Sequence, residues 1–299
     1  AFDIYVNEEE FVSVFTKILN SNPELFYVKS ECRRASAADG KLLYVEPQYF
    51  ATGDELKAQK KEYESLVSEI MGQVNTSWSD LEKVLFVHDY LVKNFRYDPD
   101  YGISEENTVY DAYRFMKTGE GVCQAYTLLA IELFNRLGIN SGAVASVEMA
   151  HAWNCVEIDG KWYHLDITWD DAMTQGNLDR FDDVLYSNFL CSDAAIKATG
   201  HYGWEADVLF DDRYDGLFLK KIDKRVDVAP LGESWYILVS GTENRVNGLV
   251  LGQIDFKNNT YNRLAFLPAV WYAWGSTTSY YPDNFSGIGS YADTLVISV

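Results

Sequence analysis

Three side chains between residues 119 and 171 are of the types that a thiol enzyme needs. Cys123 offers a thiol, His151 a base, and Asp166 a carboxylate that can orient the base. In such an enzyme the thiolate attacks a carbonyl carbon, the histidine moves protons, and the carboxylate fixes the histidine tautomer. We therefore predict that Cys123, His151 and Asp166 form a catalytic triad.

The residues after Gly121 predict a helix that begins at the cysteine. Apolar residues recur there at helical spacing, and Gly138 is a C-terminal stop signal. Cys123 then lies in the first turn, where unpaired backbone N–H groups and the positive end of the helix dipole favour the thiolate. The periodic residues are Val122, Ala125, Tyr126, Leu129, Leu133, Phe134 and Leu137.

The two other members of the predicted triad fall on a predicted hairpin. Residues 147–158 and 162–169 alternate like strands around the turn signal Asp159-Gly160. If those two residues form the turn, His151 lies opposite Thr168 and Trp153 lies opposite Asp166. His151 and Asp166 are then diagonal neighbours on one face, with Cβ atoms roughly 7 Å apart. A slip of one residue in register would put them on opposite faces.

The motifs GVCQAY and HAWN, with the carboxylate of WYHLDITW, resemble the three core motifs of the transglutaminase-like superfamily, most closely of its bacterial members. The resemblance covers roughly residues 75–175 and implies a fold related to papain-like cysteine proteases. It also implies that Cys123 is the nucleophile, His151 the general base and acid, and Asp166 the orienting group. The family includes cross-linking enzymes, proteases, amidases and inactive members, so the resemblance indicates the chemistry better than the substrate.

The oxyanion hole is only half assigned by the sequence. The backbone N–H of Cys123 is one expected donor. Papain-like enzymes add a side-chain donor upstream, often Gln, but this chain has Lys117 at that spacing of six residues. Gln124 follows the nucleophile, and the sequence does not decide its orientation.

Other polar residues near the motifs could have either a structural or a functional role. His88 lies on the apolar stripe of a predicted helix and is expected to be a hydrogen-bonded core histidine. His164 is the rival of His151 as base. Asp170 and Asp171 are expected in a solvated acidic turn, although they could order a loop or bind a substrate cation. Cys155 is expected to be a core or cleft-wall thiol.

We predict an α+β fold. Residues 75–204 would be a transglutaminase-like (papain-like) core with helices packed on an antiparallel sheet, and residues 205–299 a smaller all-β domain. Residues 1–74 would be a helix and hairpin lobe packed on the core, since ~50 residues make a marginal core alone. A chain of 299 residues agrees with about two domains.

Within the first 95 residues, apolar spacing predicts helices over 8–20 and 53–71, and a third that begins at a capping box of Ser79 and Glu82. Residues 25–28 and 42–45 are predicted strands around the turn signal Asp39-Gly40.

The last third of the chain has a β pattern. An apparent internal repeat relates residues 216–223 to 248–255, and a small antiparallel sandwich or sheet is expected. Strands are predicted at 217–222, 235–240, 249–256, 261–266 and 294–299. A cluster of aromatic residues is expected to fill a core, with a glycan or peptide platform as the alternative. This cluster is Trp271, Tyr272, Trp274, Tyr280, Tyr281 and Phe285.

Composition limits the partners. The formal charge of −20 and the pI near 4.5 argue against nucleic acid or an anionic membrane as a partner. The charge is compatible with an extracellular enzyme or with basic peptide substrates, and equally with solubility alone. Four dispersed cysteines do not suggest a disulfide scaffold, and no spacing suggests a zinc, calcium or cofactor site. No apolar run approaches the ~20 residues of a membrane span.

The chain opens at Ala1-Phe2-Asp3 without Met. We expect a mature form from which a leader has been removed, and an extracellular or cell-surface location.

The predicted function is that of a cysteine-dependent acyl-transfer enzyme on amide bonds of peptides or proteins. Transfer to water would make it a protease or amidase, and transfer to lysine a transglutaminase; we favour hydrolysis. The alternative is a non-catalytic cell-surface module that binds peptide, or glycan such as the cell wall, on the same fold.

Overall fold

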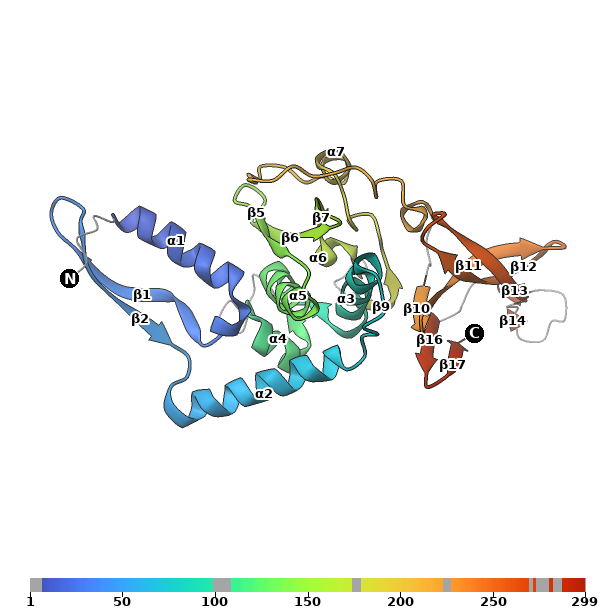
Figure 1. Ribbon diagram of the computed structural model, residues 1–299, viewed down its shortest axis with the longest axis horizontal. Coiled ribbons are helices and arrows are strands. Elements are labelled where there is room, and N and C mark those ends of the chain that lie inside the picture. The colour runs from blue at the N-terminus through green and yellow to red at the C-terminus, as the bar shows by residue number, and fades with distance from the viewer. Residues whose placement is uncertain are drawn as a thin grey trace. The chain divides into compact units, whose positions relative to one another are not determined.

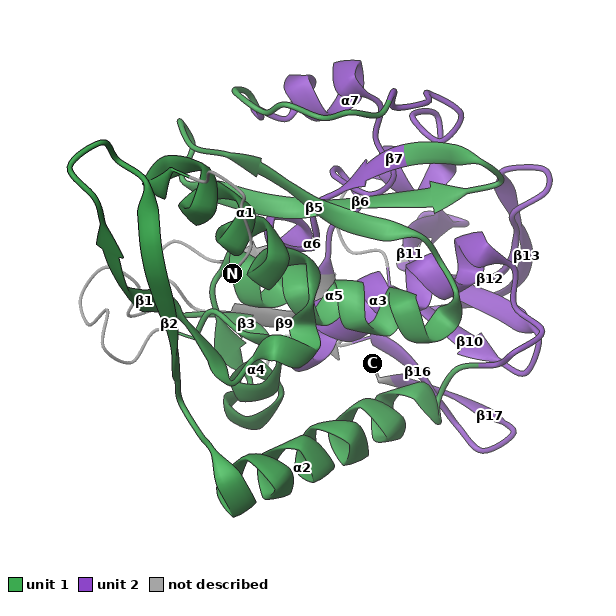
Figure 2. Ribbon diagram, turned by 60° about the vertical axis from the view of Figure 1, so that its left-hand side comes forward, with its two compact units in different colours: residues 1–74, 95–162, 202–208 green, residues 75–94, 163–201, 209–299 purple. Residues whose placement is uncertain are grey.

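The structure is a computed structural model, which describes residues 7–98, 109–173, 179–222, 227–268, 271–272, 280–281 and 287–298. The chain forms two compact units (Figure 2). Unit 1 contains residues 1–74, 95–162 and 202–208, and unit 2 contains residues 75–94, 163–201 and 209–299. The division into three consecutive domains stays a prediction.

The N-terminal lobe of unit 1, residues 7–50, consists of a helix and a hairpin (Figure 1). Helix α1 (Glu8–Ser21) begins at a capping box of Asn7 and Glu10, and a short 3₁₀ helix, Pro23–Leu25, follows it. Strands β1 (Val28–Ser36) and β2 (Leu42–Tyr49) pair antiparallel.

The first strand of the lobe was placed wrongly by the sequence. Residues 25–28 are mostly outside β1, which instead uses the polar stretch that we expected between the strands. Pro23, with its fixed φ, suits the first position of a short helix. None of the residues of β1 and β2 is buried, so polar residues meet no packing penalty there.

The remainder of unit 1 surrounds helix α5 (Cys123–Leu137), which contacts α2 (Gly53–Met71), α4 (Ala112–Thr118), β5 (Ser141–Ser146) and β6 (His151–Ile158). Strands β5 and β6 pair antiparallel, and β7 (Lys161–Leu165) follows β6 along the chain. Two short strands, β3 (Arg96–Tyr97) and β4 (Glu120–Gly121), pair in parallel just before α5. The helices at 53–71 and from Cys123 are confirmed.

Unit 2 begins with helix α3 (Asp80–Asn94), and the predicted capping box is confirmed: the Ser79 N–H donates to Glu82 Oε2 (2.8 Å) and the Glu82 N–H donates to Ser79 Oγ (3.4 Å). Helix α6 (Ile167–Asp170) and strands β8 (Asp171–Met173) and β9 (Asp179–Val184) follow, and then α7 (Asp193–Ala198). Both α6 and β9 contact α3.

The C-terminal part of unit 2 is a four-stranded antiparallel sheet with additional hairpins. The sheet has the order β10-β11-β12-β13, and Ala229, Leu238, Leu249 and Ile288 form its buried cluster. The strands are β10 (Asp227–Leu231), β11 (Ser234–Glu243), β12 (Val246–Asp255), β13 (Thr260–Leu267), β14 (Trp271–Tyr272), β15 (Tyr280–Tyr281), β16 (Gly287–Tyr291) and β17 (Thr294–Ser298).

The predicted strand at 217–222 and the internal repeat are wrong. Residues 218–221 form a 3₁₀ helix, whereas the matching residues 248–255 lie in β12. Lys220 explains the difference, because its Nζ donates to the Leu190 carbonyl (3.1 Å) and contacts Cys191 Sγ (3.3 Å). Tertiary contacts therefore override the local pattern. The side chains of the predicted aromatic cluster lie outside the described residues.

Among the described residues, no helix is both long and apolar enough to cross a membrane.

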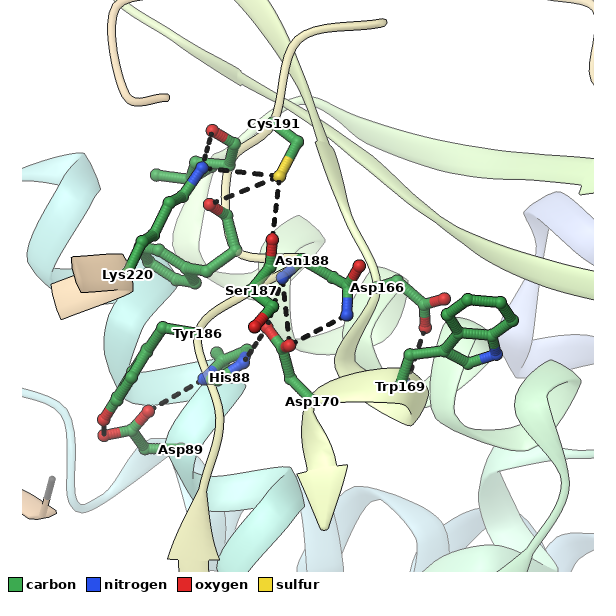
Figure 3. A network of polar contacts seen from close by, with 12 residues as sticks. His88, Asp89, Asp166, Trp169, Asp170, Tyr186, Ser187, Asn188, Cys191 and Lys220 are labelled. Atoms are coloured by element: carbon green, nitrogen blue, oxygen red, sulfur yellow. Dashed lines mark hydrogen bonds and ion pairs between the residues drawn. The ribbon is translucent and has the colours of Figure 1, made fainter. Parts of the chain in front are cut away.

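A buried polar network lies in the interior of unit 2 (Figure 3). The ring of His88, which is fully buried, lies between two carboxylates: Nδ1 is 2.8 Å from Asp89 Oδ1, and Nε2 is 3.3 Å from Asp170 Oδ2. Tyr186 donates its hydroxyl to Asp89 (3.0 Å), and Asn188 donates backbone and side-chain N–H groups to Asp170 (2.9 Å). The core role predicted for His88 is confirmed.

The network raises the proton affinity of His88. Burial alone would lower the pKa of His88, but the hydrogen bonds and negative charges of Asp170 and Asp89 outweigh it and raise the pKa to about 9. Burial also raises the pKa of Asp170, against the opposing effect of His88. The folded state therefore binds protons more tightly here than the unfolded chain does.

We predict that the free energy of unfolding falls as the pH rises from about 6.5 to about 9. Because the folded-state pKa of His88 is raised, its stabilisation is complete below pH 6.5 and is lost as the pH passes through 9. The loss should amount to at most about 3 kcal/mol. Urea unfolding followed by tryptophan fluorescence between pH 6 and 10 measures it.

His88→Gln should flatten the pH dependence in this window. His164→Gln is the matched control, since burial lowers the pKa of His164 to about 4 and that ring does not titrate between pH 6.5 and 9. Equal slopes in the wild type and in His88→Gln would contradict the prediction.

Candidate active site

Cys123 is the first residue of helix α5, as the sequence predicts, and is largely buried. Gly119 ends α4 in the left-handed region (φ 75°), and two residues of β4 lead into the new helix. The Ala125 and Tyr126 N–H groups donate to the Val122 carbonyl (2.8 and 3.3 Å), which leaves those of Cys123 and Gln124 without an acceptor within the helix. The helix dipole adds positive potential there. The sulfur thus lies at a helix N-terminus, a position that stabilises the oxyanion of an attacked carbonyl.

Helix α5 is tied to strand β6 one turn beyond the cysteine. Thr127 donates its hydroxyl to the Cys123 carbonyl (2.8 Å), and Asn154 Nδ2 donates to the Thr127 carbonyl (3.0 Å). Asn154 is buried. Our sequence reading used HAWN for its histidine only and missed this positioning role of the asparagine. The signal was an amide between the apolar residues Trp153 and Cys155, where a buried polar group needs a partner.

His151 is the first residue of β6, directly after Ala150, whose φ is 49°. Its ring stacks with that of Trp153 at 5.6 Å between centroids, and Trp153 in turn contacts Trp204 edge to face. The other three histidines, at 88, 164 and 201, are each at most 2% exposed, whereas His151 is half-buried. His151 is therefore the histidine of this chain that retains access to solvent.

The hairpin turn is confirmed and the predicted strand pairing is not. Asp159 and Gly160 both adopt positive φ (53° and 73°), as a tight two-residue turn between β6 and β7 requires. Strand β7 ends at Leu165, however, and Thr168 lies in helix α6. The predicted partner of His151 in the sheet is thus in a helix, because Asp166 caps that helix by accepting the Trp169 N–H (3.1 Å).

Asp166 is fully buried in unit 2 and pairs with a histidine that our sequence reading did not consider. His201 Nε2 donates to Asp166 Oδ2 (2.8 Å), Thr199 Oγ1 lies 3.0 Å from His201 Nδ1, and the ring of Trp169 lies 4.1 Å from that of His201. His201 therefore orients the carboxylate that we predicted as the orienting group. Its separation of 35 residues from Asp166 left no local signal in the sequence.

The rival candidates are structural. His164 is fully buried, its Nε2 lies 3.2 Å from Asp193 Oδ1, and burial lowers its pKa to about 4. Cys155 is buried, and burial raises its pKa to about 11, so the prediction of a core thiol is confirmed. The expectation of a solvated acidic turn is wrong: Asp170 and Asp171 are both buried, and Asp170 belongs to the network of His88.

The two side chains considered for the oxyanion hole have other partners. Lys117 Nζ forms an ion pair with Glu62 (3.0 Å) on α2. Gln124 Nε2 donates to Asn20 Oδ1 on α1 (3.0 Å). Gln124 therefore turns toward the N-terminal lobe, which answers the question of its orientation that the sequence left open.

Cys123 and His151 belong to unit 1, whereas Asp166 belongs to unit 2. The catalytic triad as a whole stays a prediction, as does a reaction without metal or cofactor.

Comparison with known proteins finds a family model that matches part of the chain. Residues 64–167 match the model of the transglutaminase-like superfamily. Kyphoscoliosis peptidase of Mus musculus is 24% identical over 142 residues, and that of Homo sapiens is 23% identical over 144 residues. These alignments cover 42% and 44% of this chain but only 20% and 21% of the relatives, so the chain spans about a fifth of their length.

Two solved structures are also similar. A TGase crystal structure, at 17% identity and a TM-score of 0.32, aligns with 58% of this chain and 51% of its own. A candidate cysteine protease from Cytophaga hutchinsonii, at 18% identity and a TM-score of 0.28, aligns with 46% of this chain and 61% of its own. The family match includes positions 123, 151 and 166, and in residues 64–167 the chain carries a domain of the transglutaminase-like superfamily with its α+β fold.

Proposed function

We propose that this protein is a cysteine-dependent acyl-transfer enzyme that acts on amide bonds of peptides or proteins. The observation that carries the proposal is the place of Cys123, at the N-terminus of a buried helix within the family match. The backbone N–H groups and the dipole of a helix N-terminus stabilise negative charge on the oxygen of an attacked carbonyl.

The proposed reaction has two halves. The Cys123 thiolate attacks the amide carbonyl carbon, His151 protonates the leaving amine, and the C–N bond breaks to leave a thioester. Water, deprotonated by His151, then attacks the thioester, which gives a carboxylic acid and the free thiol. The backbone N–H groups at the start of α5 donate to the oxyanion in both halves.

Asp166 and His201 would act behind the reacting groups. The Asp166 carboxylate would hold the tautomer of His151 that presents its lone pair to the thiol. The hydrogen bond from His201 and that from the Trp169 N–H fix both oxygens of this carboxylate. His201 is thus a proposed positioning residue.

Hydrolysis is the outcome that we favour over cross-linking. The two relatives described above are both named peptidases. A lysine acceptor in place of water would give the transglutaminase reaction from the same thioester. The alternative is a non-catalytic binding module. The first of the two tests that follow distinguishes it from an active enzyme.

We predict that iodoacetamide labels Cys123 at pH 6 at least about tenfold faster than it labels Cys32, because a thiolate is the reactive form. Cys32 is half-buried and serves as the internal reference. Peptide mass spectrometry across pH 5–9 locates and times the labelling. His151→Ala should abolish the fast reaction at pH 6, since the imidazolium partner is lost. Labelling of Cys123 that rises only near pH 8.5 would point to the binding module.

Asp166→Asn should lower the rate of amide hydrolysis by about 10²- to 10⁴-fold, because an amide cannot enforce the required histidine tautomer. The asparagine oxygen can still accept the Trp169 N–H, whereas its NH2 group cannot accept the hydrogen bond from His201, so the melting temperature of the variant is measured together with its rate. Steady-state hydrolysis of a peptide mixture, followed by mass spectrometry, measures the rate.

Asp193→Asn is the matched control for this change. Asp193 also pairs with a histidine, but with the structural His164, and its side chain is 46% exposed. The rate of amide hydrolysis by Asp193→Asn should equal that of the wild type. Wild-type activity in Asp166→Asn would show that another group orients His151.

A further inference from the structure

Unit 1 contains a cavity of about 570 Å³ beside the first turn of helix α5. One wall comes from the N-terminal lobe, including Leu19, Phe26 and Val28. The opposite wall comes from the region of α4 and α5, including Val109, Gln124 and Leu128. A cavity of this size takes an organic group and far exceeds the space of a single water or ion.

The base of the cavity is rigid and apolar. Phe26 is 4% exposed, and its ring packs on those of Tyr63 (5.0 Å) and Tyr113 (4.6 Å). The charged groups in the lining compensate each other, since Arg114 forms an ion pair with Asp111. The Arg114 guanidinium also lies 3.9 Å from the centre of the Phe50 ring, which fixes its place at the wall. The cavity therefore offers apolar contact without an uncompensated charge.

The cavity adjoins the nucleophile through Gln124. This residue follows Cys123 and lines the cavity, and its amide donates to Asn20 on α1. Neighbouring residues of an extended peptide are about 3.3–3.6 Å apart along the chain. A side chain two or three residues from an amide held at Cys123 can therefore reach the cavity.

We propose that this cavity is a specificity pocket for a large apolar side chain of a peptide substrate, such as leucine or phenylalanine, on the acyl side of the attacked amide. The inference rests on the proposed function. The acyl side follows from the chemistry: the acyl part stays bonded to Cys123 as a thioester while the amine leaves and water enters. A pocket that holds the acyl part thus serves both half-reactions.

Peptidyl chloromethyl ketones test the pocket on the full chain, because alkylation of Cys123 forms one S–C bond and releases chloride. Two series of acetylated tetrapeptides would carry glycine, leucine or phenylalanine at the second or third residue from the reactive carbon. Only one of these two positions is expected to place its side chain in the cavity. In the series that varies this position, leucine or phenylalanine should raise the second-order rate constant of Cys123 alkylation at least about tenfold over glycine.

Val28→Trp should fill the cavity and reduce that preference to about one. Ser30→Trp, at an exposed residue of the same lining, is a second filled variant in case Val28→Trp does not fold. Val14→Trp is the matched control, since Val14 is 55% exposed on α1 and lies outside the lining, and it should keep the preference.

A wild type without preference, or a preference that survives in the folded filled variants, would overturn the pocket. Iodoacetamide needs no pocket, so its reaction with Cys123 separates the two proposals. Fast iodoacetamide labelling at pH 6 without side-chain preference removes the pocket and leaves the proposed function. Slow labelling of Cys123 by every reagent removes both.

Discussion

The first turn of α5 is held from three sides, and the placement of the nucleophile depends on these contacts. Asn154 binds it to strand β6 through Thr127, and Gln124 binds it to helix α1 through Asn20. On the third side Gly121 approaches closely: a Cβ there would lie 2.7 Å from Phe115 Cδ2 and 2.8 Å from Ala125 Cβ. Only glycine permits this approach without a shift of the helix. Because the first turn is fixed, the N-terminus of helix α5 and the Cys123 sulfur keep a constant position relative to each other.

Buried polar groups divide the four histidines by role. His88 lies between two carboxylates, His164 faces Asp193, and His201 faces Asp166, and all three rings are buried. A buried imidazole that is hydrogen-bonded to a carboxylate cannot readily leave its place to move protons at a substrate. His151 is half-buried at the start of β6, and this partial exposure to solvent agrees with its proposed role as base.

The sequence predicted what depends on local patterns. Helices over 8–20 and 53–71, the helix from Cys123, the Ser79 cap and the Asp159-Gly160 turn all follow from spacing or from one residue's backbone preference. It failed where distant residues decide. Residues 218–221 left the strand state because Lys220 reaches Leu190 and Cys191. His201, the hydrogen-bond partner of Asp166, follows helix α7 and is 35 residues away in the sequence. No local sequence pattern predicts that these two residues are in contact.

The C-terminal sheet joins helix α3 more closely than an appended domain would. Trp78 Nε1 donates to the Gly232 carbonyl (3.1 Å), and its ring lies 5.1 Å from that of Trp235. At the other end of α3, Lys93 forms an ion pair with Asp227 and donates to the Val228 carbonyl (2.9 Å). Without the sheet, the large apolar surface of Trp78 would meet water, and Lys93 would lose its partners. Since α3 also carries His88, the sheet supports the helix that holds the buried network together.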